Sequence, residues 1–258
     1  MQRTPSLSWL GRAVAAATLA LALSACGTGV SNLEGPRKDN LHFTRPHPED
    51  FPVHGIDVSK YQGDIDWAQV RASGVQFAWI KSTEGADHMD EKFQQNWINA
   101  KAAGLPRGAY HFVYWCRPPH EEMNWFKQNV PIDPDALPPV LDVEATPTSK
   151  TCKRKLYREE VLRDMREMLL DMERHYGKKP VIYSTVDFYQ SILHPNEFSD
   201  YQIWVRSTKH PPHVPYGQRK WAFWQYQSDG YIPGIKGKVD RNAFVGDAGQ
   251  WRAFLSGR

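Results

Sequence analysis

The sequence predicts a closed α/β barrel in which strands and helices alternate and whose last third has lost its helices. Two observations support this fold class. From residue 53 onward, eight short segments rich in β-branched and aromatic residues follow one another, and helical patterns separate the first six of them. After the sixth segment the connections contain Pro and Gly instead of helical patterns. Alternating strands and helices indicate parallel β/α units, and eight strands suffice to close a barrel.

The expected strands are residues 53–58, 75–82, 107–115, 139–145, 180–185, 202–207, 221–226 and 238–241. The expected helices are residues 65–73, 90–103, 119–129, 156–176 and 186–193. In the longest of these, apolar residues recur at helical spacing, which predicts a helix packed against the core. The length of 258 residues suits one such domain.

Composition excludes several classes of protein. With 12% aromatic and 24% charged residues, the chain is neither disordered nor a multi-span membrane protein. The net charge of +3 is too small to indicate nucleic-acid binding, although it mildly favours anionic polymers such as cell-wall material. A monomer is the default expectation.

The N-terminal segment has the features of a bacterial lipoprotein signal. Arg3 and Arg12 precede an apolar run over residues 13–23, which is too short to span a bilayer as a stable helix. The run closes on Leu-Ser-Ala-Cys, which resembles the lipobox of bacterial lipoproteins. We therefore expect residues 1–25 to be a lipoprotein signal peptide and Cys26 to be lipidated.

Residues 26–52 are expected to form a flexible spacer between the lipidated cysteine and a catalytic barrel of residues 53–258. The membrane would be contacted through the N-terminal lipid. The expected location is the bacterial cell envelope, on the periplasmic face. The outer membrane is favoured over the inner one, because no Asp follows the cysteine to suggest inner-membrane retention.

If Cys26 carries lipid, Cys116 and Cys152 remain as a pair in an oxidising compartment, where they can form a disulfide. No CxxC or HExxH spacing occurs, so no dedicated metal site is expected.

Polar residues lie at the ends of the expected strands, where a β/α barrel carries its chemistry. They are Asp57, Glu84, His111, Asp142, Glu144, Tyr183, Gln225 and Asp240. Because side chains alternate along a strand, Asp142 and Glu144 point to the same face about 6.5 Å apart. Two carboxyls in one cavity resist joint ionisation, so one keeps its proton while the other is ionised. Cleavage of a glycosidic bond needs this combination of a proton donor and an anion.

Seven short motifs in order carry a resemblance to a known family. They are HGIDVSKYQG at 54–63, IKSTEG at 80–85, GAYHF at 108–112, LDVE at 141–144, IYS at 182–184, WQYQSDG at 224–230 and VDRN at 239–242. Together they resemble glycoside hydrolase family 25, the Chalaropsis-type lysozymes or N-acetylmuramidases. The resemblance implies a single flattened TIM-like (β/α)5(β)3 barrel, which agrees with the loss of helices inferred above.

The resemblance also implies roles for individual residues. Glu144 matches the general acid, and Asp142 matches a carboxylate that orients or stabilises the reacting sugar. Asp57 and Asp240 match two further acids of the groove. The expected sugar contacts are Tyr110, Tyr183, Trp224 and Gln225. The implied activity is cleavage of the β-1,4 bond between N-acetylmuramic acid and N-acetylglucosamine in peptidoglycan glycan strands, with no metal or organic cofactor.

Several residues keep two interpretations. Glu84 can lie near the substrate or pair with Lys81 or Lys60. His111 is expected to be a hydrogen-bonded barrel histidine more than a catalytic one. Trp115 is expected to stack on sugar rings at a strand end, whereas Trp79 and Trp204 are expected in the core.

Two residues depart from the family pattern and add positive charge near strand ends. Arg206 and Arg241 can favour the anionic peptide stems of peptidoglycan or form salt bridges with acids of the groove. Two alternative functions remain at this point. One is a chitinase-type hydrolase, and the other is a catalytically silent, lipid-tethered glycan-binding or scaffold protein of the same fold.

Overall fold

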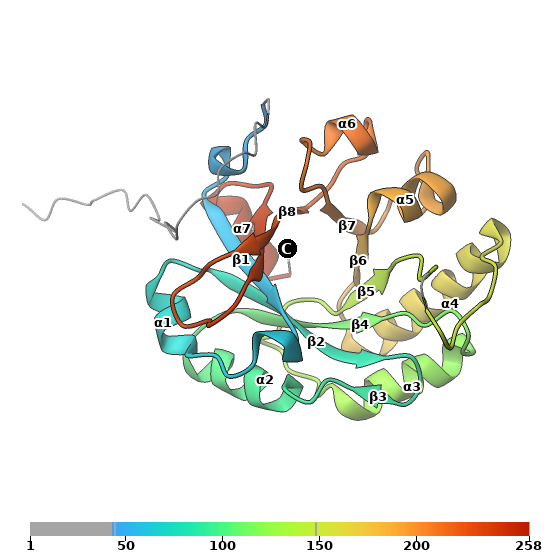
Figure 1. Ribbon diagram of the computed structural model, residues 1–258, viewed down its shortest axis with the longest axis horizontal. Coiled ribbons are helices and arrows are strands. Elements are labelled where there is room, and N and C mark those ends of the chain that lie inside the picture. Colours follow the sequence, from blue (N-terminus) through green and yellow to red (C-terminus); the bar gives the residue numbers. More distant parts are fainter. Residues whose placement is uncertain (1–42, 44, 148, 258) are drawn as a thin grey trace, which may run out of the picture. The chain divides into compact units, whose positions relative to one another are not determined.

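The computed structural model describes residues 43, 45–147 and 149–257, and within them one sheet closes into a barrel (Figure 1). The barrel strands are β1 (Val53–Val58), β2 (Phe77–Glu84), β4 (Arg107–Phe112), β5 (Val140–Val143), β6 (Val181–Ser184), β7 (Gln202–Arg206), β8 (Phe223–Gly230) and β9 (Val239–Phe244). Their order is β1-β9-β8-β7-β6-β5-β4-β2, and a β1–β2 pairing closes the ring. Each of the eight expected strands is therefore confirmed. A short strand, β3 (His88–Met89), forms an additional antiparallel pair with β2.

The helices on the outer side follow the expected order. They are α1 (Trp67–Ala72), α2 (Phe93–Ala102), α3 (Pro119–Asn129), α4 (Arg158–Tyr176) and α5 (Val186–Phe188), which continues into the π-helical turn η3 (Tyr189–Leu193). In α4 the apolar residues face the core, and the helix ends at Gly177 in the left-handed conformation with φ 64°. Helices α2 and α3 pack along the outer face of β2 (Figure 1).

Two helices appear where the sequence analysis expected none. The one-turn helix α6 (His213–Tyr216) follows β7, and α7 (Ala248–Leu255) follows β9. Helix α7 begins with a capping box, because the Asp247 side chain accepts from the backbone of Gln250 and the Gln250 side chain accepts from the backbone of Asp247. Trp251 of α7 packs against Phe77 and Phe244.

Strand β9 runs in the opposite direction to the other seven strands of the barrel. The strand pairs β1–β2, β2–β4, β4–β5, β5–β6, β6–β7 and β7–β8 are parallel. Strand β9 pairs antiparallel with both β8 and β1. Residues 231–238 connect β8 to β9 without a helix, and such a short connection can join only antiparallel neighbours. The beginning of β9 therefore lies at the barrel end where the parallel strands finish.

Aromatic rings fill the interior of the barrel toward the starts of the parallel strands. The end where those strands finish is polar. Trp79 stacks on Trp204 with a centroid distance of 5.7 Å, and Phe77 and Phe223 pack beside them. Gly108 makes room for this layer, because a Cβ there would lie 2.1 Å from the Trp79 ring. The aromatic layer forms a floor on which the polar residues nearer the strand ends rest.

Part of the expected spacer is ordered against the barrel. Residues 48–50 form a 3-10 turn, η1 (Pro48–Asp50), capped by His47, and a second such turn, η2 (Lys60–Gln62), follows β1. The Phe43 ring contacts Trp224 at 5.0 Å, so the described end of the spacer buries aromatic surface on the barrel. The expected signal peptide, Cys26 and the rest of the expected spacer lie outside the described residues.

Candidate active site

A cleft of about 260 Å³ opens at the end of the barrel where the parallel strands finish. It is lined by Asp57, Val58, Ser59, Tyr61, Gln62, Lys81, Tyr110, Phe112, Asp142, Glu144, Tyr183, Trp204, Gln225 and Asp240. The alternation of side chains along each strand explains why these residues meet, because most of them occupy inward-facing positions. Seven of the ten residues expected from the sequence to be catalytic or to contact the sugar are therefore brought together.

Asp57 is the centre of a hydrogen-bond network that joins several strands. Its Oδ2 accepts from Nε2 of Gln225 at 2.9 Å and from Nδ2 of Asn242 at 2.8 Å. The Tyr183 hydroxyl donates to Oε1 of Gln225 at 2.9 Å, and the Trp204 indole donates to Oδ1 of Asn242 at 2.8 Å. These bonds fix the Asp57 carboxyl in one orientation. Asn242 is not among the residues expected from the sequence, although it stands two residues after Asp240 and so faces the same side of β9.

Asp57 and Asp240 are register partners in the antiparallel pair of β1 and β9. Burial raises the pKa of Asp57 well above its ordinary value, and the negative charge of Asp240 raises it further. Burial also raises the pKa of Asp240, while hydrogen bonding with Asp57 and the charge of Arg206 act against that rise. The two carboxyls therefore bind protons more readily than carboxyls in water.

Asp142 and Glu144 form the second carboxyl pair of the cleft. Asp142 lies in β5 and is only 6% exposed, whereas Glu144 directly follows β5 and is half-buried at the mouth of the cleft. Burial, and then the charge of Glu144, raise the pKa of Asp142 well above its ordinary value. Burial also raises the pKa of Glu144, while Arg206, Asp142 and Lys81 act to lower it. Burial therefore makes both carboxyls bind a proton more readily than a carboxyl in water does.

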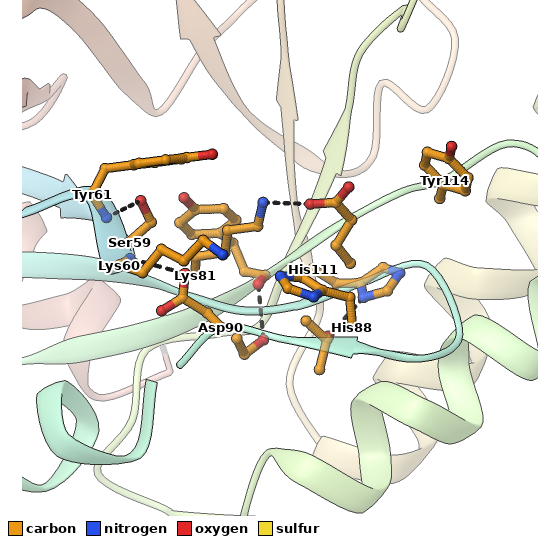
Figure 2. Close-up of polar contacts among 12 residues, drawn as sticks. Ser59, Lys60, Tyr61, Lys81, His88, Asp90, His111 and Tyr114 are labelled. Carbon is orange, nitrogen blue, oxygen red and sulfur yellow. Dashed lines mark hydrogen bonds and ion pairs between the residues drawn. The ribbon is translucent and has the colours of Figure 1, made fainter. Parts of the chain in front are cut away.

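Lys81, and not Glu84, reaches the cleft from β2. The Lys81 ammonium lies 2.7 Å from Oε2 of Glu84, and Figure 2 shows this ion pair beside the labelled Lys81. In the pairing of β2 with β4, Lys81 is aligned with Tyr110 and Glu84 with Phe112, because the register shifts after Lys81. The side chains of Lys81 and Glu84 therefore lie on the same side of β2. Glu84 does not line the cleft, so the expected contact with the sugar is absent from the described residues of the site. Its other interpretation, an ion pair with Lys81, is the one that the structure shows. Lys60 pairs instead with Glu91.

The expected sugar contact of Trp224 is wrong. Trp224 has no exposed surface, its indole donates to the backbone carbonyl of Ser207 at 2.8 Å, and its ring lies on the outside of the barrel against Phe43. Neighbouring residues of a strand face opposite sides, so Trp224 faces outward because Gln225 faces inward. Trp204 lines the cleft in its place, in addition to its position in the core.

Trp115 also differs from the expectation of a sugar platform. It is almost fully buried, stacks on Phe188 at 5.5 Å, and donates from Nε1 to the backbone carbonyl of Glu144 at 2.7 Å. The aromatic ring that is open to solvent at the cleft is instead Tyr61, which is 82% exposed. Tyr61 is not among the residues expected from the sequence, although it belongs to the same motif, residues 54–63, as Asp57.

His111 lies outside the cleft, on the outer face of β4 (Figure 2). Its Nδ1 is 2.7 Å from Oγ1 of Thr83 and its Nε2 is 2.9 Å from Oε2 of Glu122. All three side chains are fully buried. His111 is therefore a hydrogen-bonded barrel histidine, as expected.

The two arginines that depart from the family pattern face different sides. Arg206 ends β7 on the side that carries Trp204, and its charge acts on both Glu144 and Asp240. Arg241 faces outward, where it donates to Gln227 at 3.2 Å. Within the described part of the chain, neither arginine forms an ion pair with an acid of the cleft.

Cys116 and Cys152 form a disulfide with a Cα–Cα distance of 5.6 Å, as the sequence analysis allowed. Across the described ranges, no cluster of three or more His, Cys, Asp or Glu side chains is arranged to hold a metal ion. None of the helices formed by those residues is both long enough and apolar enough to cross a membrane.

Comparison with known proteins identifies the family. The sequence model of glycosyl hydrolases family 25 matches residues 56–235. The chain belongs to this family. The protein YegX of Escherichia coli strain K12 is 36% identical over 222 residues, which make up 81% of this chain and 76% of YegX. Lysozyme M1 of Streptomyces globisporus is 35% identical over 218 residues, covering 79% of this chain and 71% of that enzyme.

A solved structure of a family 25 glycosyl hydrolase from Bacillus anthracis is similar throughout the barrel. It superposes with a TM-score of 0.72 at 35% identity, and the match covers 82% of this chain and 96% of that chain. The closed eight-stranded barrel is thus the fold of a family 25 enzyme. Both the fold class and the family that the sequence motifs indicated are confirmed.

Proposed function

We propose that the protein is a lysozyme that hydrolyses the β-1,4 bond between N-acetylmuramic acid and N-acetylglucosamine in peptidoglycan. The observation that carries this proposal is the meeting of two carboxyl pairs, Asp142 with Glu144 and Asp57 with Asp240, in one open cleft. Membership of glycosyl hydrolase family 25 and the similarity to Lysozyme M1 support the same substrate.

Glu144 is the general acid of this reaction. It lies at the mouth of the cleft, where a glycan strand can reach it, and its raised pKa lets it keep a proton to higher pH than a glutamate in water does. The proton moves from the Glu144 carboxyl to the glycosidic oxygen as the bond from that oxygen to the anomeric carbon breaks. Glu144 then takes a proton from the water that completes hydrolysis and is restored.

Asp142 stabilises the reacting sugar. A nucleophile must be ionised, and the burial of Asp142 opposes its ionisation. This favours a role in holding the acetamido group of the substrate over direct attack on the anomeric carbon. Asp57, held by Gln225 and Asn242, lies beside its partner Asp240, and whichever carboxyl of this pair is ionised stabilises the positive centre that develops during cleavage.

The products of digestion test the reaction. Purified peptidoglycan is digested with the protein, and the muropeptides are reduced with borohydride and analysed by mass spectrometry. We expect new reducing ends on N-acetylmuramic acid. Reducing ends on N-acetylglucosamine, or none at all, would contradict the proposed bond specificity.

The rival function of a catalytically silent glycan-binding or scaffold protein predicts the loss of at least one acid from the cleft. All four acids are present and meet in the cleft, so no feature of the site favours that rival. The motif before Asp142 is Pro138, Pro139 and Val140, where a chitinase-type hydrolase would carry further acids.

We also propose that the protein is a lipoprotein of the bacterial cell envelope, with residues 1–25 removed and Cys26 lipidated. The Leu-Ser-Ala-Cys sequence at the end of the apolar run supports this. Expression with radiolabelled palmitate should label the wild-type protein and leave Cys26→Ala unlabelled. A labelled Cys26→Ala protein would contradict the anchor.

A further inference from the structure

A second hollow, of about 510 Å³, lies beside the segment that follows Glu144. Its lining includes Ala145, which directly follows Glu144, together with Lys153, Arg154, Tyr157 and Arg158. Among the described residues, no Asp or Glu lines it. The hollow therefore starts next to the proposed general acid and has a positively charged wall.

The sequence of this wall is unusually basic. Residues 150–158 contain Lys150, Lys153, Arg154, Lys155 and Arg158, and no acidic residue. Most of these basic side chains either form ion pairs within the structure or do not line the hollow. Arg154 pairs with Glu160 and Asp164, and Arg158 pairs with Glu159 and Glu197.

Lys153 is the available charge of the hollow. It is exposed, it lines the hollow, and among the described residues it has no ion pair. Tyr157, 54% exposed, and the partly buried Leu156 add apolar surface to the same wall. The hollow thus combines an unpaired ammonium group with apolar contacts.

The basic segment is fastened to the body of the barrel. The disulfide joins Cys152 to Cys116, and Arg154 donates to the backbone carbonyl of Trp115 at 2.8 Å. Trp115 in turn donates to the backbone carbonyl of Glu144 at 2.7 Å. These contacts hold the hollow at a fixed position relative to the proposed general acid, so a ligand bound there is placed relative to the bond that is cut.

We propose that this hollow is a subsite for the acidic stem peptide that muramic acid carries in peptidoglycan. The inference rests on the proposed function. When the scissile bond lies at Glu144, a peptide-bearing muramic acid lies beside it, and its stem extends away from the glycan. Stem peptides combine free carboxylates with small apolar side chains, which match Lys153 and the apolar wall in charge and chemistry.

The test compares a charge reversal in the hollow with one outside it. Lys153→Glu reverses the available charge, and Lys220→Glu makes the same change before β8, at the opposite end of the barrel from the cleft. Lys220 is likewise exposed, and it has no ion pair in the described part of the chain. Both variants are checked by thermal unfolding. Each is assayed on intact peptidoglycan and on glycan strands from which an amidase has removed the peptides.

We expect Lys153→Glu to raise KM on intact peptidoglycan about threefold to tenfold, the range for loss and reversal of an exposed ion pair. Its kcat should stay unchanged, as should KM on stripped strands. Lys220→Glu should change none of these values. An equal rise of KM on both substrates, or no rise on intact peptidoglycan, would overturn the subsite.

A binding measurement separates this inference from the proposed function. If the wild-type protein hydrolyses neither substrate, the proposed function fails, and titration calorimetry with the free tetrapeptide L-Ala-D-Glu-diaminopimelate-D-Ala then decides the subsite alone. Weaker binding to Lys153→Glu than to Lys220→Glu and the wild type supports it. Equal binding by all three proteins, or binding by none, contradicts it.

Discussion

The indole nitrogen of Trp115 donates a hydrogen bond of 2.7 Å to the backbone carbonyl of Glu144. Trp115 follows β4, and Glu144 follows the neighbouring strand β5, so the bond joins two adjacent strand ends at the cleft. The Trp115 ring is held in turn by stacking on Phe188. The backbone that carries the proposed general acid is therefore fixed by a buried aromatic residue that does not line the cleft.

Removal of this bond should lower activity through the position of Glu144. Trp115→Phe keeps an aromatic ring against Phe188 but leaves the Glu144 carbonyl without its donor. We expect kcat to fall about tenfold with little change in KM, and the free energy of unfolding to fall by about 1 kcal/mol more than in the control. The control is Trp79→Phe, which makes the same change at a buried indole whose nitrogen has no partner among the described residues. Equal losses of kcat in the two variants would contradict the positioning role.

The pH dependence of activity should report the charge of Arg206. A general acid must be protonated, so kcat/KM should fall as the pH rises through the raised pKa of Glu144. The positive charge of Arg206 favours the ionised carboxylate, so Arg206→Gln should raise that pKa and move the alkaline limb to higher pH. Arg241→Gln removes an outward-facing charge and should leave the limb in place. A shift to lower pH in Arg206→Gln would show that the limb belongs to another group.

Asp142 should destabilise the folded protein at neutral pH. Its pKa is raised by burial, so the folded protein binds more protons than the unfolded chain between the ordinary pKa of an aspartate and the raised one. Stability is therefore highest below this window and falls as the pH rises through it. Asp142→Asn should raise Tm at pH 7.5 and give a smaller difference at pH 4, while activity falls. A Tm difference that does not depend on pH would contradict this linkage.

Reduction of the disulfide should loosen the basic segment beside Glu144. The bond closes a loop with a sequence separation of 36, and Cys116→Ser should lower the free energy of unfolding by about 2–4 kcal/mol. Denaturant unfolding of this variant measures that loss. Addition of dithiothreitol to the wild-type protein should lower stability in the same way and leave Cys116→Ser unaffected. Unchanged stability of the reduced wild-type protein would contradict the prediction.

The strands could be predicted because each carries a short apolar or alternating pattern bounded by turn residues. Their direction was harder to infer. Alternating strands and helices predict parallel units, but β9 is antiparallel because residues 231–238 leave no room for a crossover helix. Asp240 consequently lies near the start of its strand and still reaches the cleft. Helix α7 was missed although Asp247 and Gln250 carry the spacing of a capping box.

The acids of the cleft could be predicted because alternation places Asp142 and Glu144 on one face. The same rule could have excluded Trp224, since it cannot share a face with its neighbour Gln225. Other features depend on contacts between distant segments. The hydrogen bond from Trp204 to Asn242 and the approach of Trp115 to Glu144 join residues that no local pattern connects.

The rate at which Glu144→Gln releases reducing ends from purified peptidoglycan tests the central claim most directly. The amide keeps the shape of the side chain but cannot donate the proton, so the rate should fall about 10²- to 10⁴-fold while thermal unfolding stays close to that of the wild type. A Glu144→Gln protein that digests peptidoglycan at a near-wild-type rate would contradict the assignment of Glu144 as general acid.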